Sequence, residues 1–292
     1  MNIRSVKADF LLLTTAVIWG AAFVAQRVGM DYVGPLTFNG TRFAIGALAL
    51  IPLIRFLDGK KKKQGSYTPA DRKQLLIGGV ISGAALFAGA TLQQWGVVYT
   101  TAGNAGFITG LYVVLVPIMG LLWKQKTGTG TWTGAVLAVV GMYLLSVHGS
   151  LKINFGDMLV FFSAFFWAGH VLIIAWLSPR MDSIKLACVQ FAACSIFSLI
   201  LAVALEKITL EGLIGGAIPI LYGGLMSVGV AYTLQVVAQK DAKPAHAAII
   251  LSLESFFAAV SGCLLLGETM TTQGIVGCGL MLCGMIISQL KQ

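Results

Sequence analysis

Two ionisable side chains stand inside long apolar stretches of the sequence, which makes them candidates for chemistry. Glu254 lies in "AAIILSLESFFAAV" and Arg42 lies in "FNGTRFAIGALAL". In an apolar setting a carboxylate can accept a proton or pair with a cationic ligand, and a guanidinium can bind a carboxylate through two parallel hydrogen bonds. The structural alternatives are that Glu254 hydrogen-bonds to neighbouring helix ends, and that Arg42 ties helix ends together or extends its charge toward the surface.

Aromatic side chains recur at corresponding places in the two halves of the chain. Trp19 in "AVIWGAAFV" corresponds to Trp167 in "SAFFWAGHV", and His170 follows Trp167 at a spacing that puts both on one helix face. His170 has no companion His or Cys at metal-ligand spacing, so the sequence predicts neither a metal site nor a cofactor. The alternative to a cavity is aromatic packing between helices. The residues expected to line a cavity are Trp19, Tyr112, Trp167, His170, Tyr232 and Glu254.

A Thr-Leu-Gln triplet occurs at Thr91 and again at Thr233, and the difference between these numbers is 142. The same offset relates Tyr112 to Glu254, which we expect near the membrane midplane. Polar side chains accompany both triplets, and we interpret them as two gate clusters, one at each mouth of a pathway. Simple capping of helix ends is the alternative. The gate candidates are Gln93, Gln94, Asn104, Gln235 and His246.

The composition predicts which kind of element positions these residues. The chain of 292 residues is 57% hydrophobic and 11% charged, with a mean hydropathy of +0.86. Soluble domains average about 25% charged residues. From Gln74 to Trp123 no charged residue occurs, and one membrane-spanning helix needs only about 20 apolar residues. This run must therefore hold two spans, and the chain is predicted to be an all-α membrane protein.

The apolar runs predict ten transmembrane helices, which places both termini on one side. All but four of the 20 Lys and Arg residues then lie on that side or at helix ends facing it; the exceptions are Arg27, Arg42, Lys152 and Lys207. By the positive-inside rule the termini are cytoplasmic. This also explains the net charge of +9 without nucleic acid. The predicted helices cover 9–29, 34–57, 73–98, 102–123, 129–148, 155–177, 183–205, 211–238, 243–266 and 270–290.

The two halves predict an internal repeat, with residues 1–148 and 149–292 each holding five helices. Because five is odd, the second half starts from the opposite face of the membrane. The halves would then form an inverted-topology repeat, and exchange of their conformations would give alternating access.

Three segments resemble the drug/metabolite transporter superfamily, in particular its ten-helix EamA-type members. They are "AVIWGAAFVAQRVGMDYVGPLTFNGTRFAIGALAL", "TLQQWGVVYTTAGNAGFITGLYVVLVPIMG" and "LSLESFFAAVSGCLLLGETMTTQGIVGCGLMLCG". The last is similar to the family's Leu-Glu-Pro signature, with Ser255 where Pro is usual, which puts the associated kink in doubt. The resemblance implies a secondary transporter whose central cavity lies between the halves. It also implies peripheral helices at 129–148 and 270–290.

The leading hypothesis is an inner-membrane secondary transporter, not an enzyme, for an amino acid, amine, metabolite or drug-like compound. The expected partners are this solute, the lipid bilayer and, through Glu254, protons, and the sequence leaves open a monomer or a homodimer. An uncoupled facilitator of the same solutes is the alternative. A membrane-embedded enzyme or lipid-handling protein is a remote third, because the sequence has no nucleophile elbow, Walker A loop or zincin motif.

Overall fold

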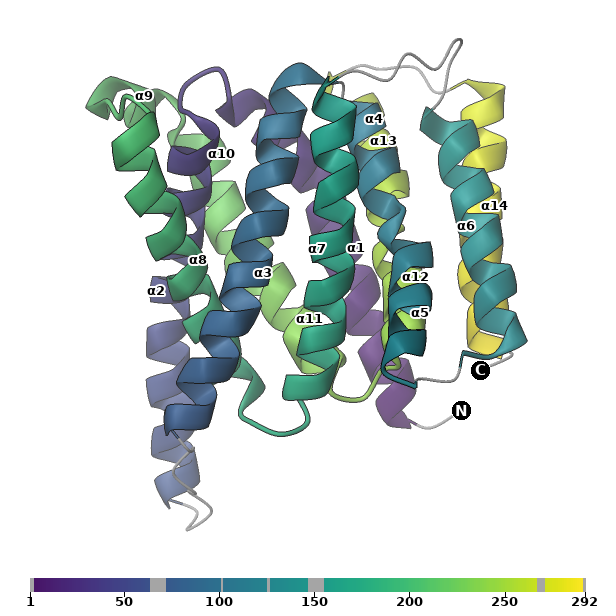
Figure 1. The fold of residues 1–292 in the computed structure, drawn as a ribbon, viewed down its shortest axis with the longest axis horizontal. Helices are drawn as coiled ribbons and strands as arrows, with labels where there is room; N and C mark the ends of the chain where they lie inside the picture. The colour runs from purple at the N-terminus through teal and green to yellow at the C-terminus, as the bar shows by residue number, and fades with distance from the viewer. Residues whose placement is uncertain are drawn as a thin grey trace.

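The computed structural model describes residues 3–63, 72–100, 102–124, 127–146, 155–266 and 271–290. These residues form helices that stand side by side, with no strand among them, and α1 begins at the same end of the bundle at which α14 ends (Figure 1). In the first half the helices are α1 (Ile3–Gly29), α2 (Pro35–Lys63), α3 (Arg72–Tyr99), α4 (Ala102–Gly110), α5 (Tyr112–Leu122) and α6 (Thr129–Ser146). In the second half they are α7 (Phe155–Leu177), α8 (Ser183–Leu205), α9 (Leu210–Gly215), α10 (Ala217–Leu221), the π-helix η1 (Tyr222–Tyr232), α11 (Thr233–Ala238), α12 (Pro244–Leu251), α13 (Glu254–Leu266) and α14 (Thr272–Leu290).

Within the described ranges, 8 helical stretches are long and apolar enough to cross a membrane. Two further apolar helices, Thr129–Leu144 and Thr272–Ser288, are shorter. The prediction of an all-helical membrane protein with many spans is therefore confirmed. The two shorter helices, α6 and α14, pack mainly against each other and lie together at the right-hand edge of Figure 1. This agrees with the peripheral position that the resemblance implied for them.

Three of the predicted helices are wrong in one respect, because the structure interrupts them. The stretch 102–123 breaks at Leu111, and 243–266 breaks at Ser252 and Leu253. The stretch 211–238 breaks at Gly216 and continues as α10 and then as the π-helix η1. At the last break the Ser252 hydroxyl donates to the carbonyl of Ile249 (2.8 Å). A serine that competes for backbone carbonyls in this way weakens the helical pattern. The interruption that the Ser255 substitution put in doubt is therefore present, without a proline.

Close contact between helices depends on glycines, as the sequence pattern Gly79-x-x-x-Gly83 suggests. A Cβ atom at Gly79 would lie 2.3 Å from Cγ1 of Val189, and one at Gly83 would lie 2.8 Å from the backbone oxygen of Gln190. Both contacts are with α8, so α3 and α8 approach more closely than any larger residue would allow.

The α2 and α8 helices run antiparallel and are tied together at both ends. At one end, Glu206 directly follows α8 and caps the start of α2. Its Oε1 accepts the N–H of Leu36 (2.8 Å), and its Oε2 accepts the N–H (2.8 Å) and the hydroxyl (2.7 Å) of Thr37. A carboxylate at a helix N-terminus satisfies free N–H groups and opposes the helix dipole.

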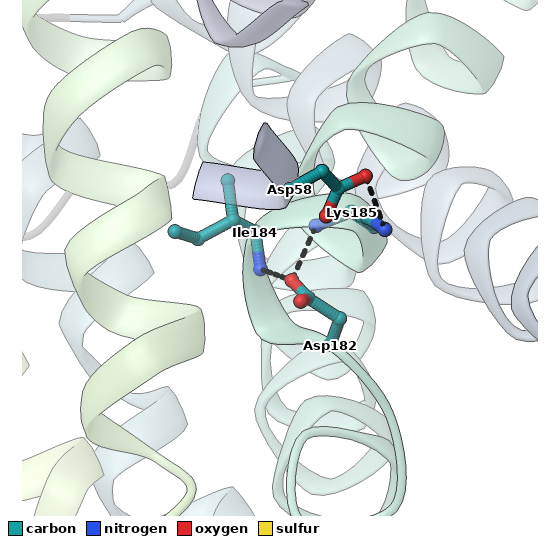
Figure 2. Close-up of polar contacts among 4 residues, drawn as sticks. All are labelled: Asp58, Asp182, Ile184 and Lys185. Carbon is teal, nitrogen blue, oxygen red and sulfur yellow. Dashed lines mark hydrogen bonds and ion pairs between the residues drawn. The ribbon is translucent and has the colours of Figure 1, made fainter. Parts of the chain in front are cut away.

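At the other end, Lys185 in the first turn of α8 pairs with Asp58 of α2, with Nζ and Oδ2 2.8 Å apart (Figure 2). Asp182 caps α8 by accepting the N–H groups of Ile184 (3.1 Å) and Lys185 (3.2 Å). These contacts hold Arg42, on α2, against the helices of the second half.

Replacing Glu206 with Gln is expected to lower the free energy of unfolding by about 1–2 kcal/mol, because the amide keeps one acceptor but loses the charge. Detergent-solubilised protein unfolded by heat or by a denaturing detergent measures this change. Glu211→Gln is the matched control, since Glu211 is exposed on α9. Equal stability of the Glu206 variant and the control would refute the capping role.

Candidate functional site

One cavity, of about 30 Å³, is lined by side chains from both halves of the chain. It includes most of the residues that the sequence predicts for a cavity wall, together with Arg42 and the two glutamines of the Thr-Leu-Gln triplets. The α2 helix contributes through Arg42. The lining residues are Trp19, Phe23, Gln26, Arg42, Gln93, Thr109, Tyr112, Trp167, Val171, Ser227, Tyr232, Gln235, Leu251 and Glu254.

Tyr232, at the end of η1, is the centre of an aromatic cluster. Its ring centroid lies 4.4 Å from that of Trp19 and 6.1 Å from that of Trp167, and the Trp167 ring is stacked on it. Phe43 lies 5.8 Å away on the side of α2. Three of these rings, Trp19, Trp167 and Tyr232, line the cavity, and the face of an aromatic ring attracts cations.

His170 lies behind this cluster instead of in the cavity lining. Its ring contacts Trp167 (6.2 Å) and Tyr232 (6.4 Å) edge-on, and its Nε2 is 2.9 Å from Oε1 of Gln190 on α8. The i, i+3 spacing therefore does bring Trp167 and His170 together, and His170 packs against the aromatic cluster from outside the cavity lining.

Arg42 is held with its guanidinium in the cavity wall and is only 2% exposed. Its Nε donates to Oδ1 of Asn39 (3.0 Å), and Asn39 in turn donates to the carbonyl of Ala90 on α3 (3.1 Å). The charged carbon lies 5.0 Å from the ring of Phe43 and 5.4 Å from that of Phe38. Within the described part of the chain no carboxylate pairs with Arg42. The two terminal nitrogens of the Arg42 guanidinium are therefore available to bind a ligand.

Glu254 opens α13 and is 5% exposed, so its carboxyl group is also buried at the cavity. It lines the cavity together with Tyr112 and Tyr232. No cation among the described residues forms an ion pair with it. Arg42, Tyr232 and Glu254 line the same cavity, and among the described residues Arg42 and Glu254 do not form an ion pair with each other.

The predicted gate residues fall into different surroundings. Gln93 donates to the hydroxyl of Thr109 (3.0 Å), and Gln94 donates to the carbonyl of Gln26 (3.3 Å). Gln235 lines the cavity. Asn104 stands on α4, and its side chain lies outside the described residues. Their role as gates stays a prediction.

His246 makes a separate buried cluster near the first turns of α1. Its Nε2 is 3.0 Å from Oδ1 of Asp9, and its Nδ1 is 2.9 Å from the hydroxyl of Ser288. The structure therefore joins His246 to α1 and α14 and not to Gln235. Sequence reasoning missed Asp9. It could have been identified as a candidate because it is a carboxylate at the edge of an apolar run.

Sequence reasoning also missed Asn39, Gln26 and Thr109, which support or line the cavity. Each is a neutral polar residue inside an apolar run. No group of three His, Cys, Asp or Glu residues in the described ranges could hold a metal ion.

Long apolar helices that enclose a cavity lined by two ionisable side chains, Arg42 and Glu254, indicate a polytopic membrane protein with a candidate internal site. The family model described as "EamA-like transporter family" matches residues 6–147 and again residues 154–289. The chain therefore belongs to the EamA-like transporter family, and it is a membrane transporter and not an enzyme.

Relatives with transporter names align over most of the chain. An "Uncharacterized transporter" of Archaeoglobus fulgidus is 33% identical over 292 residues, covering 99% of this chain and 88% of the relative. "Uncharacterized transporter YoaV" of Bacillus subtilis is 22% identical, covering 97% of each chain. "Uncharacterized inner membrane transporter YedA" of Escherichia coli is 22% identical, covering 89% of this chain and 83% of the relative.

A solved crystal structure has the same fold. It superposes with a TM-score of 0.77 at 14% sequence identity, covering 97% of this chain and 96% of that chain. At this identity the likeness concerns the fold alone.

Proposed function

We propose that the chain is a secondary transporter that moves a small organic solute across the inner membrane by alternating access. The solute class is an amino acid, an amine, a related metabolite or a drug-like compound. The observation that carries this proposal is that Arg42 and Glu254 both line one aromatic cavity and that neither has an ion pair among the described residues. Charges at membrane depth are costly and mark substrate or ion pathways.

The two charges and the rings suit complementary parts of one solute. A guanidinium binds a carboxylate with two hydrogen bonds, while Glu254 and the faces of Trp19 and Tyr232 suit an ammonium group. A solute with both groups would satisfy both buried charges at once. Glu254 is also the proposed proton site, which would couple solute movement to a proton gradient.

The small size of the cavity supports a conformational cycle. A volume of about 30 Å³ holds about one or two water molecules, so an organic solute enters only when helices move apart. The breaks at Leu111, Gly216 and Ser252 lie in segments that contribute to the cavity wall. Discontinuous helices at a central site are a recurring feature of secondary transporters.

The proposed architecture has ten spans in two five-helix repeats of inverted topology, residues 1–148 and 149–292, with both termini cytoplasmic. Two successive matches of one family model support the repeat. The excess of Lys and Arg on the side of the termini supports the orientation. The proposed partners are the solute, the lipid bilayer and protons, without nucleic acid, and the transporter works as a monomer or a homodimer.

Purified protein in proteoliposomes tests this function. Uptake of labelled amino acids, amines and amphiphilic drugs is measured with and without a pH gradient, and empty liposomes are the control. We expect saturable flux of at least one compound, stimulated by the gradient. No flux for any compound across the panel, by protein that is folded and oriented both ways, would refute the proposed solute class.

A further inference from the structure

A second and larger pocket, of about 360 Å³, lies between α1 and the end of α11, at the end of the bundle where α1 begins. Its volume is within the range of roughly 300–1,000 Å³ typical of small-molecule sites. The pocket has a charged rim and an apolar wall. The rim is made by Arg4, Lys7, Lys240 and Asp241, and the wall by Ala8, Leu11, Val237 and Ala238.

The rim is basic and its lysines are uncompensated. Three of its four ionisable groups are cationic. Within the described residues, the ammonium groups of Lys7 and Lys240 have neither an ion pair nor a hydrogen bond. Lys7 on α1 and Lys240 just after α11 line the same pocket and would repel each other, so an anion between them would relieve this repulsion as well as gain direct attraction.

The pocket is separate from the central cavity, although both lie along α1. Leu11 lines the pocket and Trp19 lines the cavity. Thr15 lies between them on the same helix face, and its hydroxyl is 3.1 Å from the carbonyl of Ala231 in η1. This buried contact closes α1 against η1, so a ligand of the pocket need not be the transported solute.

We propose that this pocket binds the phosphate of a membrane phospholipid, with Lys7 and Lys240 contacting the phosphate oxygens. The wall below the charged rim is apolar, which favours a lipid over a soluble phosphate. A phospholipid in a bilayer has the same order, with its charged headgroup at the surface and its apolar chains beneath. Basic pockets between spanning helices at the membrane surface are suited to anionic headgroups. Bound lipid would tie the start of α1 to the end of α11.

The test measures the affinity of the detergent-solubilised full chain for short-chain phosphatidylglycerol. Diacylglycerol, which lacks the phosphate, and glycerol 3-phosphate, which lacks the acyl chains, are the comparison ligands. We expect phosphatidylglycerol to bind at least tenfold more tightly than either. Equal binding of diacylglycerol would overturn the role of the phosphate, and equal binding of glycerol 3-phosphate would overturn the lipid as its source.

Matched substitutions separate a built site from general surface charge. Lys240→Gln is expected to weaken phosphatidylglycerol binding about fivefold, whereas Lys243→Gln, three positions on and outside the pocket lining, should change it less than twofold. Asp241→Asn should tighten binding, because it removes the negative charge from the rim. Equal losses for the two lysine variants, or weaker binding by the Asp241 variant, would overturn the proposal.

Discussion

Arg42→Lys is expected to lower the apparent affinity for carboxylate-bearing solutes by about 10- to 100-fold, while carboxylate-free amines change less than about threefold. The substitution keeps the positive charge, so the protein should fold. It removes the planar fork that binds a carboxylate through two hydrogen bonds, and a hydrogen bond to a charged group contributes about 1.5–3 kcal/mol. It also removes the bond from Nε to Asn39 that orients the guanidinium.

Uptake kinetics in proteoliposomes measure this effect, with KM determined separately for a carboxylate and an amine of similar size. Arg27→Lys is the control, because Arg27 is an exposed residue in the last turn of α1. If both classes of solute lost affinity equally, Arg42 would have a structural role in the bundle and the assignment of the fork to a solute carboxylate would be wrong.

Glu254→Gln is expected to reduce gradient-driven uptake by tenfold or more while exchange of labelled for unlabelled solute continues. The amide has the size of the carboxyl group and keeps a hydrogen-bonding group near Tyr112, so the cavity should keep its shape. It cannot take up and release a proton, so coupling to the gradient is lost. A solute that also depends on the Glu254 charge for its ammonium group would lose affinity in both assays.

Counterflow and gradient-driven uptake, measured on the same vesicles, separate these effects. Glu211→Gln, an exposed carboxylate at the end of the bundle, controls for the loss of one acidic group. Unchanged gradient-driven uptake in the Glu254 variant would exclude this residue as the proton site. If the wild-type protein itself showed only gradient-independent exchange, the uncoupled facilitator would replace the proposed mechanism.

Much of the architecture follows from the sequence because a bilayer imposes strict local requirements. A spanning segment must satisfy its own backbone hydrogen bonds and present about 20 apolar residues. The apolar runs around Trp19, Leu86 and Trp167 meet this condition without reference to any partner. The i, i+3 spacing of Trp167 and His170 likewise fixes that they share a helix face. The lengths of the apolar runs therefore predicted the helices, and the sequence shows Arg42 and Glu254 within those runs.

The composition of the site, in contrast, depends on how helices rotate and pack against one another. Trp19, Arg42 and Tyr232 are far apart in the chain, and only the tertiary structure places their side chains around one cavity. The break at Leu111 was also invisible in a pattern that reads as apolar, whereas the Leu-Glu-Pro resemblance raised a kink near Ser255 that only the structure could decide.

Side-chain contacts between different helices show most clearly what depends on the tertiary structure alone. His246 follows Gln235 in the repeated pattern, yet it bonds to Asp9 and Ser288 from opposite ends of the chain. The sequence by itself determined that Arg42 and Glu254 lie within apolar runs. Whether each charge finds a partner depends on contacts between distant segments, and those contacts leave Arg42 and Glu254 without an ion pair in the described residues.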